Sequence, residues 1–94
     1  MLNQMIKRRL EEYGWRLDRC EADFPLPQDM DDAWRDHGDA GVTGHFIKHM
    51  HDQPVMRLRV RIYGDDVVAR GPDGALRMLN DILGEIQKEE LTDG

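Results

Sequence analysis

The sequence predicts an α+β domain, a small antiparallel sheet of three or four strands with two helices packed on one face. Apolar residues at helical spacing open the chain over residues 2–13 and close it over residues 74–88. Between these segments, apolar and polar residues alternate strictly over residues 56–63, which is typical of a strand with one buried face. The expected order is helix, strand, acidic insert, three strands, helix (α-β-(acidic insert)-β-β-β-α).

The length of 94 residues suits a single domain, residues 1–94, with one modest core. Hydrophobic residues make up 39% of the chain and charged residues 34%, as in soluble globular proteins. The single cysteine, Cys20, excludes an internal disulfide. No apolar run approaches the ~20 residues of a membrane span, and the N-terminus does not resemble a signal peptide. We therefore expect a cytoplasmic protein that has no contact with a membrane.

The first helix is predicted from Leu2, Ile6 and Leu10, which fall on one side of a helix. Gly14 favours a helix end because glycine destabilises a helix interior. Residues 15–20 are then a short strand. A helix continuing to Cys20 is the alternative, because the apolar spacing extends that far.

Residues 21–44 form an acidic insert, a long connection between regular elements. Residues 18–39 contain eight acidic and two basic side chains. Pro25 and Pro27 interrupt regular structure, and a short helix is predicted over residues 28–37. Trp34 lies in this helix. It either contacts a partner or folds the insert onto the domain.

A hairpin follows, because Gly64-Asp65 suits a two-residue turn between residues 56–63 and 67–70. This turn pairs Ile62 with Val67 on the buried face. After Gly71-Pro72, the closing helix presents an apolar stripe of Ala75, Leu76, Leu79, Ile82, Leu83 and Ile86. Two glutamates near its end oppose the helix dipole and predict fraying after Lys88.

The strand before the hairpin carries three histidines of the same parity, His45, His49 and His51. A two-residue turn at Gln53-Pro54 would bury them, whereas a turn one residue longer would bury Phe46 and Met50. Burying a large apolar side chain is worth roughly 2 kcal/mol, so the outward register is favoured for the histidines. Lys48 then faces inward and must reach the edge of the sheet.

The same histidines are the candidate metal ligands, because neutral imidazoles two residues apart on a strand can converge on zinc. Cys20 or His37 could supply a further ligand. Their spacing is not specific to a zinc site. We expect solvated surface histidines and no cofactor.

Few residues offer other catalytic chemistry. The chain has no serine, its threonines are Thr43 and Thr92, and Cys20 lies in no nucleophile motif. A histidine acting as a general base, as in RNA cleavage, is the remaining option.

Three features carry a resemblance to HicA-type toxins of toxin–antitoxin pairs. They are a first helix that ends at Gly14-Trp15, a histidine-bearing strand over residues 44–49, and a closing helix after Gly71-Pro72. The resemblance covers residues 6–15 and 44–86. It implies a fold like a double-stranded-RNA-binding domain and a ribonuclease activity that uses His45. The family's Gly-Ser-His motif reads Thr43-Gly44-His45 in this chain.

A second function fits the charges better. Four basic side chains and one acidic side chain fall in residues 45–63, within a chain of net charge −6. That net charge disfavours general nucleic-acid binding, although contact with nucleic acid stays possible. We therefore expect a small acidic non-enzymatic binding protein, an adaptor or inhibitor of the kind phages and mobile elements encode, with a protein partner. The candidate partner-binding residues are Trp34, Asp31, Asp32, Asp36, Arg57, Arg59 and Arg61. The alternative is the HicA-like ribonuclease.

Overall fold

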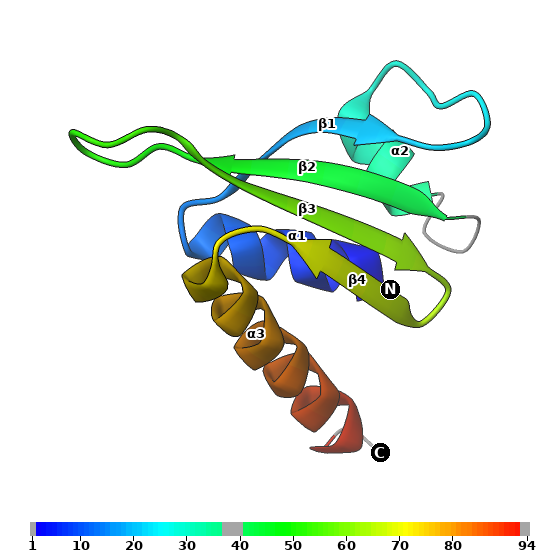
Figure 1. Ribbon diagram of the computed structural model, residues 1–94. Helices are drawn as coiled ribbons and strands as arrows, with labels where there is room; N and C mark the ends of the chain where they lie inside the picture. Colours follow the sequence, from blue (N-terminus) through cyan, green and yellow to red (C-terminus); the bar gives the residue numbers. More distant parts are fainter. Residues whose placement is uncertain (1, 37–40, 93–94) are drawn as a thin grey trace.

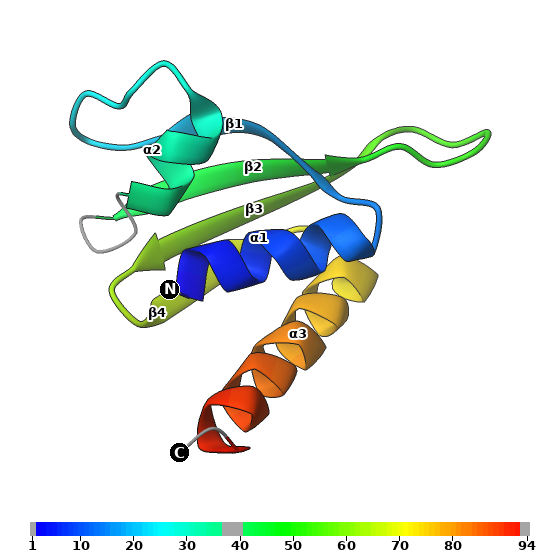
Figure 2. The ribbon, with the colours of Figure 1, turned by 180° about the vertical axis from the view of Figure 1, so that it is seen from behind.

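The computed structural model describes residues 2–36 and 41–92, without the side chains of residues 36 and 90–92. Its elements are α1 (Leu2–Glu12), β1 (Arg16–Glu21), α2 (Met30–Asp36), β2 (Val42–Lys48), β3 (Met56–Tyr63), β4 (Asp66–Arg70) and α3 (Asp73–Thr92). The strands form one antiparallel sheet in the order β1-β2-β3-β4. All three helices lie on the same face of it (Figures 1 and 2). The predicted α+β class and element order are confirmed, with α2 as a third helix on that face.

The first helix ends where glycine permits a left-handed turn. Gly14 has a φ of 90°, and the amide of Trp15 donates to the carbonyl of Leu10 across 2.9 Å. The amide of Tyr13 donates to the same carbonyl at 3.1 Å, so Leu10 accepts two hydrogen bonds where the helix ends. The chain then enters β1 at Arg16, so the alternative of a helix continuing to Cys20 is wrong.

The β3–β4 hairpin has the predicted register. Ile62 pairs with Val67 and Val60 pairs with Ala69, which places all four on the helix-covered face. Gly64 opens the turn with a φ of 61°, a conformation that glycine adopts without strain.

The β2–β3 pair settles which way His45 points. His45 lies opposite Arg59, and Phe46 lies opposite Leu58. Phe46 is fully buried, so the face that His45 shares with the arginines is the one away from the helices. The outward prediction is confirmed for His45.

Two parts of the β2 prediction are wrong. The strand ends at Lys48, so His49, Met50 and His51 lie in a seven-residue loop, 49–55, that projects from the body (Figure 1). Met50 is therefore half-buried in the loop instead of in the core. The ladder stops here because Pro54 has no N–H to donate, and Asp52 has a left-handed φ of 58°.

The core lies between the sheet and the helices. Trp34 of α2 belongs to it, with an indole ring that meets Phe46 edge to face at 5.4 Å between ring centroids. The approach is close enough that a Cβ on Gly44 would come within 2.7 Å of the indole. The largest fully buried side chains among the described residues are Trp34, Phe46, Ile6, Leu10, Leu58, Ile62, Ile82, Ile86, Val42 and Val60.

The closing helix is longer than predicted. It continues to Thr92 instead of fraying after Lys88, and its C-terminal half extends beyond the sheet (Figures 1 and 2). Arg9 of α1 ties the two helices together through ion pairs with Glu85 at 3.5 Å and with Glu89. None of the helices, over the residues described, has the length and apolar character needed to cross a bilayer.

Candidate functional site

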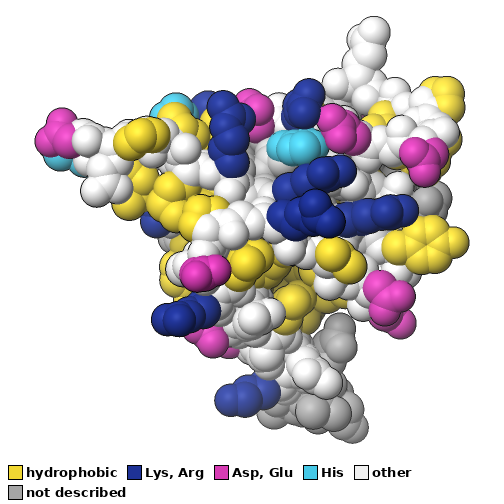
Figure 3. Space-filling model, viewed as in Figure 1, with side chains coloured by type: hydrophobic (Ala, Val, Ile, Leu, Met, Phe, Trp, Pro, Cys, Tyr) yellow, Lys and Arg dark blue, Asp and Glu magenta, His cyan; other side chains and the backbone are white. Residues whose placement is uncertain are grey.

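Arginines gather on the face of the sheet that the helices leave open. Alternate side chains of each strand point to this face, and the cross-strand pairs assign six arginines to it. Figure 3 shows basic side chains over this part of the molecule, with a histidine among them. We call this surface the arginine face, and it consists of Arg16, Arg19, Arg57, Arg59, Arg61 and Arg70.

The three arginines of β3 are the centre of the face. Arg57, Arg59 and Arg61 are solvent-exposed. None of the three forms an ion pair within residues 2–36 and 41–92. They are therefore charges displayed to solvent.

Arg16, Arg19 and Arg70 were not among the predicted site residues. Arg70 could have been found, because the predicted hairpin already buries Ala69 and so turns its neighbour outward. Arg16 could also have been found, because it adjoins the buried Leu17, whereas Arg19 could not. A bulge between Leu17 and Arg19 shifts the register, so that Arg16 lies opposite Ile47 and Arg19 opposite His45.

The arrangement works against the stability of the sheet. Arg59 lies directly opposite Arg70, and Arg57 and Arg61 flank it on the same strand face. Like charges placed directly opposite destabilise a sheet, by up to about 1 kcal/mol for a pair. The attraction of Arg59 for the carboxylate of Glu21 offsets part of this repulsion.

Two solvent-open hollows share Arg59 and Arg61. One, of about 340 Å³, is lined by Arg59, Arg61, Thr43 and Glu21, among others. The other, of about 200 Å³, is lined by Arg59, Arg61, Val68 and Arg70. Guanidinium groups match the geometry of carboxylate and phosphate groups, with which they form paired hydrogen bonds. The second hollow, lined by three arginines and no carboxylate, can therefore accept an anionic group, whereas Glu21 and Asp23 both line the first.

His45 is paired with a carboxylate. Its Nε2 lies 3.3 Å from Oε2 of Glu21, and the imidazole lowers the pKa of that carboxyl, with smaller contributions from Arg19 and Arg59. The geometry of the contact is not that of a well-aligned hydrogen bond, and the Nε2 atom is shielded from solvent. The pair lies within the arginine face, beside the cross-strand neighbour Arg59.

Acidic groups bound the arginine face. Glu21 and Asp18 of β1 and Asp66 of β4 are exposed, and Arg19 is paired with Glu21 at 3.0 Å. The basic surface is therefore compact, with negative charge at both sheet edges.

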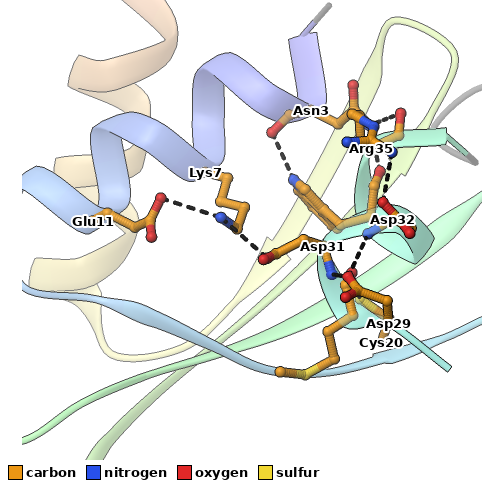
Figure 4. A network of polar contacts seen from close by, with 10 residues as sticks. Asn3, Lys7, Glu11, Cys20, Asp29, Asp31, Asp32 and Arg35 are labelled. Atoms are coloured by element: carbon orange, nitrogen blue, oxygen red, sulfur yellow. Dashed lines mark hydrogen bonds and ion pairs between the residues drawn. The ribbon is translucent and has the colours of Figure 1, made fainter.

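The predicted role of Trp34 as a partner contact does not fit its position. The side chain is fully buried, so of the two interpretations the structure supports the one in which it folds the insert onto the domain. Figure 4 shows how α1 and α2 face each other here, with Asn3 bonded to the backbone of α2. A buried indole cannot serve as an exposed anchor.

The aspartates of the insert serve local contacts. Asp31 pairs with Lys7 at 3.2 Å and Asp32 with Arg35 at 2.6 Å. Oδ1 of Asp29 accepts from the amides of Asp31 and Asp32 and so caps α2, which begins at Met30 instead of at residue 28. The side chain of Asp36, the other predicted contact, lies outside the described residues.

The cysteine of β1 is unsuited to nucleophilic chemistry. Cys20 is half-buried, and burial, with a contribution from the negative charge of Asp31, raises the pKa of its thiol to about 11. Only the thiolate attacks electrophiles, so this thiol is inert near neutral pH.

The histidines are dispersed. His49 Nε2 lies 3.5 Å from a guanidinium nitrogen of Arg16, whereas His51 pairs with Asp52 at 3.3 Å. Residues 2–36 and 41–92 hold no group of three His, Cys, Asp or Glu side chains that could bind a metal. His37 lies outside the described residues.

Comparisons of this chain with family models, with curated proteins and with solved structures gave no match. The resemblance to HicA-type toxins therefore stays a prediction.

Proposed function

We propose that this chain is a non-enzymatic binding protein, an adaptor or inhibitor, that docks an acidic protein surface on its arginine face. The observation that carries the proposal is the cluster of Arg57, Arg59 and Arg61. These side chains are exposed, form no ion pair within the described residues, and repel one another. A partner that supplies carboxylates would remove this repulsion, which would explain why the chain keeps the cluster.

Charge distribution favours a protein partner over a nucleic acid. The arginine face is bounded by Asp18, Glu21 and Asp66, and the chain has a net charge of −6. A nucleic acid presents a continuous row of phosphates that would meet these carboxylates, and its affinity depends on an extended basic footprint. A folded acidic protein can instead place its carboxylates opposite the arginines and avoid the acidic residues around them. Such charge complementarity gives specificity and steers association.

The ribonuclease reading has one observation in its favour. His45, the residue that the resemblance to HicA-type toxins assigns to catalysis, lies on the arginine face beside Arg59. However, its Nε2 faces Glu21 and has no contact with solvent. A general base must come within hydrogen-bonding distance of the proton that it removes, so this nitrogen would need a rotated imidazole. The binding function is therefore preferred.

Affinity capture tests the proposal. The chain, the variant Arg59→Glu/Arg61→Glu and the control Arg8→Glu/Arg77→Glu are used as baits in a nuclease-treated extract of the source organism. Arg8 and Arg77 are exposed on α1 and α3, so the control makes the same charge change away from the arginine face. We expect an acidic protein that binds the wild type and the control, with at least tenfold weaker binding to the Arg59/Arg61 variant.

The salt dependence and the identity of the bound molecule complete the test. Binding through exposed arginines weakens as ionic strength rises, because salt screens surface charges. A partner that binds both charge variants equally would contradict the proposal. Capture of RNA alone from a parallel untreated extract, lost after nuclease treatment, would favour the ribonuclease hypothesis instead. The size and charge of the chain also suit an inhibitor encoded by a phage or mobile element.

A further inference from the structure

The two edges of the sheet differ in whether another strand can add to them. At one edge, the bulge between Leu17 and Arg19 of β1 interrupts the ladder, a common protection against strand addition. At the other edge, five consecutive residues of β4 pair with β3 without irregularity. The outer side of β4 is therefore a regular template for a further strand.

The hairpin turn determines which backbone groups point outward from β4. In a hairpin with a two-residue loop, the flanking residues Tyr63 and Asp66 form a hydrogen-bonded pair, and bonded and non-bonded pairs then alternate. The amides and carbonyls of Asp66, Val68 and Arg70 thus face β3. Those of Val67 and Ala69 point toward the free edge.

β4 is complementary to itself in one antiparallel register. If Val68 lies opposite Val68 of a second copy, Val67 of each chain lies opposite Ala69 of the other. The residues with outward-pointing backbone groups then face each other, as hydrogen-bonded pairs require. This register pairs all five residues of β4, whereas a shift to either side leaves residues unpaired.

The side chains fit the same register. Asp66 lies opposite Arg70 of the second copy, twice by symmetry, and neither forms an ion pair within the described part of its own chain. Val68 is 61% exposed, the highest value among the large hydrophobic side chains described, and would meet its own copy at the symmetry axis. Opposite-charge pairs and β-branched pairs both stabilise neighbouring strands.

An apolar groove on the helix-covered side of β4 could also contact the second copy. A groove of about 400 Å³ adjoins β4 and is lined by Leu2, Val67, Leu83 and Ile86, with Asp65 and Gln87 at its polar margin. The C-terminal half of α3 extends beyond the sheet on the helix-covered side (Figures 1 and 2). If a strand of a second copy pairs with β4, its side chains on the helix-covered side would therefore lie next to this apolar groove.

We propose that two copies of this chain associate through β4, joining their sheets into one sheet of eight strands around a two-fold axis. Symmetric pairing of an identical surface is the usual way in which small proteins form dimers. The joined sheet places two arginine faces side by side. In it, Arg70 gains the carboxylate of Asp66 from the second copy, which offsets its repulsion from Arg59. The evidence for this association does not rest on the partner proposed for the arginine face, although Val68 and Arg70 also line one of the hollows on that face.

Sedimentation equilibrium or light scattering on the purified chain tests the dimer over a range of concentrations. We expect a dimer that dissociates on dilution, because a five-residue joint is small. Val68→Lys should make the chain monomeric, since two lysines would meet at the axis. Val55→Lys, a matched change at an exposed valine in the loop 49–55, should not.

A charge exchange at Asp66 and Arg70 tests the register. Asp66→Arg places like charges opposite each other in both pairs, and Arg70→Asp does the same, so each should weaken the dimer at least tenfold. The double variant Asp66→Arg/Arg70→Asp restores both pairs and should recover most of the lost affinity. A chain that is monomeric up to millimolar concentration would overturn the proposal. So would a dimer that Val68→Lys leaves intact or that the charge exchange fails to rescue.

Discussion

Asn3 and Trp34 hold each other across the contact between α1 and α2. The indole Nε1 of Trp34 donates to the backbone carbonyl of Asn3 at 2.6 Å, and the side-chain amide of Asn3 donates to the carbonyl of Trp34. Asn3 also donates to the carbonyl of Arg35 at 2.7 Å. Both residues are buried, so these bonds fix the acidic insert to the start of the chain.

Replacing Trp34 by alanine should therefore destabilise the whole domain. Loss of a large buried aromatic costs about 3–5 kcal/mol. Trp34→Phe keeps a ring against Phe46 but removes the Nε1 donor, so it should cost less. Urea denaturation measures the free energy of unfolding of both variants. A Trp34→Ala variant as stable as the wild type would show that the insert is not part of the core.

Asn3→Ala should cost about 1–3 kcal/mol, because it leaves two carbonyls of α2 without their buried donor. The bond from Trp34 Nε1 is retained, since its acceptor is the backbone of residue 3. Gln4→Ala, a change at the neighbouring, more accessible position, is the matched control. Equal unfolding free energies for the two variants would contradict the role given to Asn3.

The apolar stripe of α3 makes a third prediction. Leu79 and Ile82 are 2% and 0% exposed, so Leu79→Ala and Ile82→Ala should each cost about 2–5 kcal/mol. Arg77→Ala, on the exposed side of the same helix, should be close to neutral. Chemical denaturation measures the free energies of unfolding of the three variants. Losses within experimental error at both apolar positions would mean that α3 does not pack on the core.

The sequence predicts a structural feature well when the residues that determine it lie close together in the chain. The β3–β4 register was predictable because the turn at Gly64-Asp65 and the alternation of β3 lie within one short segment. The burial of Trp34 depends on contacts with Gly44 and Phe46, which are distant in the chain. No pattern around residue 34 predicts those contacts. The arginine face was found only where strict alternation exposed it, in β3.

The remaining site residues required tertiary structure. The bulge in β1 changes which residues face outward after Leu17, so the outward position of Arg19 does not follow from strict alternation. His49 shares parity with His45 but leaves the sheet, because β2 ends one residue before it. Alternation along the sequence predicts which face of the sheet a side chain lies on only for residues within the strand.

The thiol of Cys20 gives a prediction of pH dependence. Its pKa is raised from 9.0 to about 11, so alkylation by iodoacetamide should rise with pH through an inflection near 11 in the folded protein. The urea-unfolded chain is the control and should react with an inflection near the ordinary value. Because the pKa is raised on folding, the protonated thiol's contribution to stability is complete below about pH 9 and is lost as the pH rises toward 11. An inflection at or below 9 in the folded protein would contradict the burial described.

His45→Ala separates the two functional readings. A binding protein that acts through Arg57, Arg59 and Arg61 should keep its partner affinity within about threefold, because His45 Nε2 is turned toward Glu21 and away from solvent. NMR titration should show the pKa of Glu21 rising toward its ordinary value in this variant, since His45 is the main cause of the lowered value. Metal-free RNA cleavage by the wild type that disappears with His45→Ala would establish the ribonuclease instead.

If the arginine face serves a partner and not the fold, Arg59→Glu should leave the domain at least as stable as the wild type. This change places a carboxylate opposite Arg70 and between Arg57 and Arg61. We expect a free energy of unfolding at least equal to that of the wild type in low salt, with the difference shrinking as salt screens the charges. A loss of about 1 kcal/mol or more would show that Arg59 supports the structure, and would contradict the account.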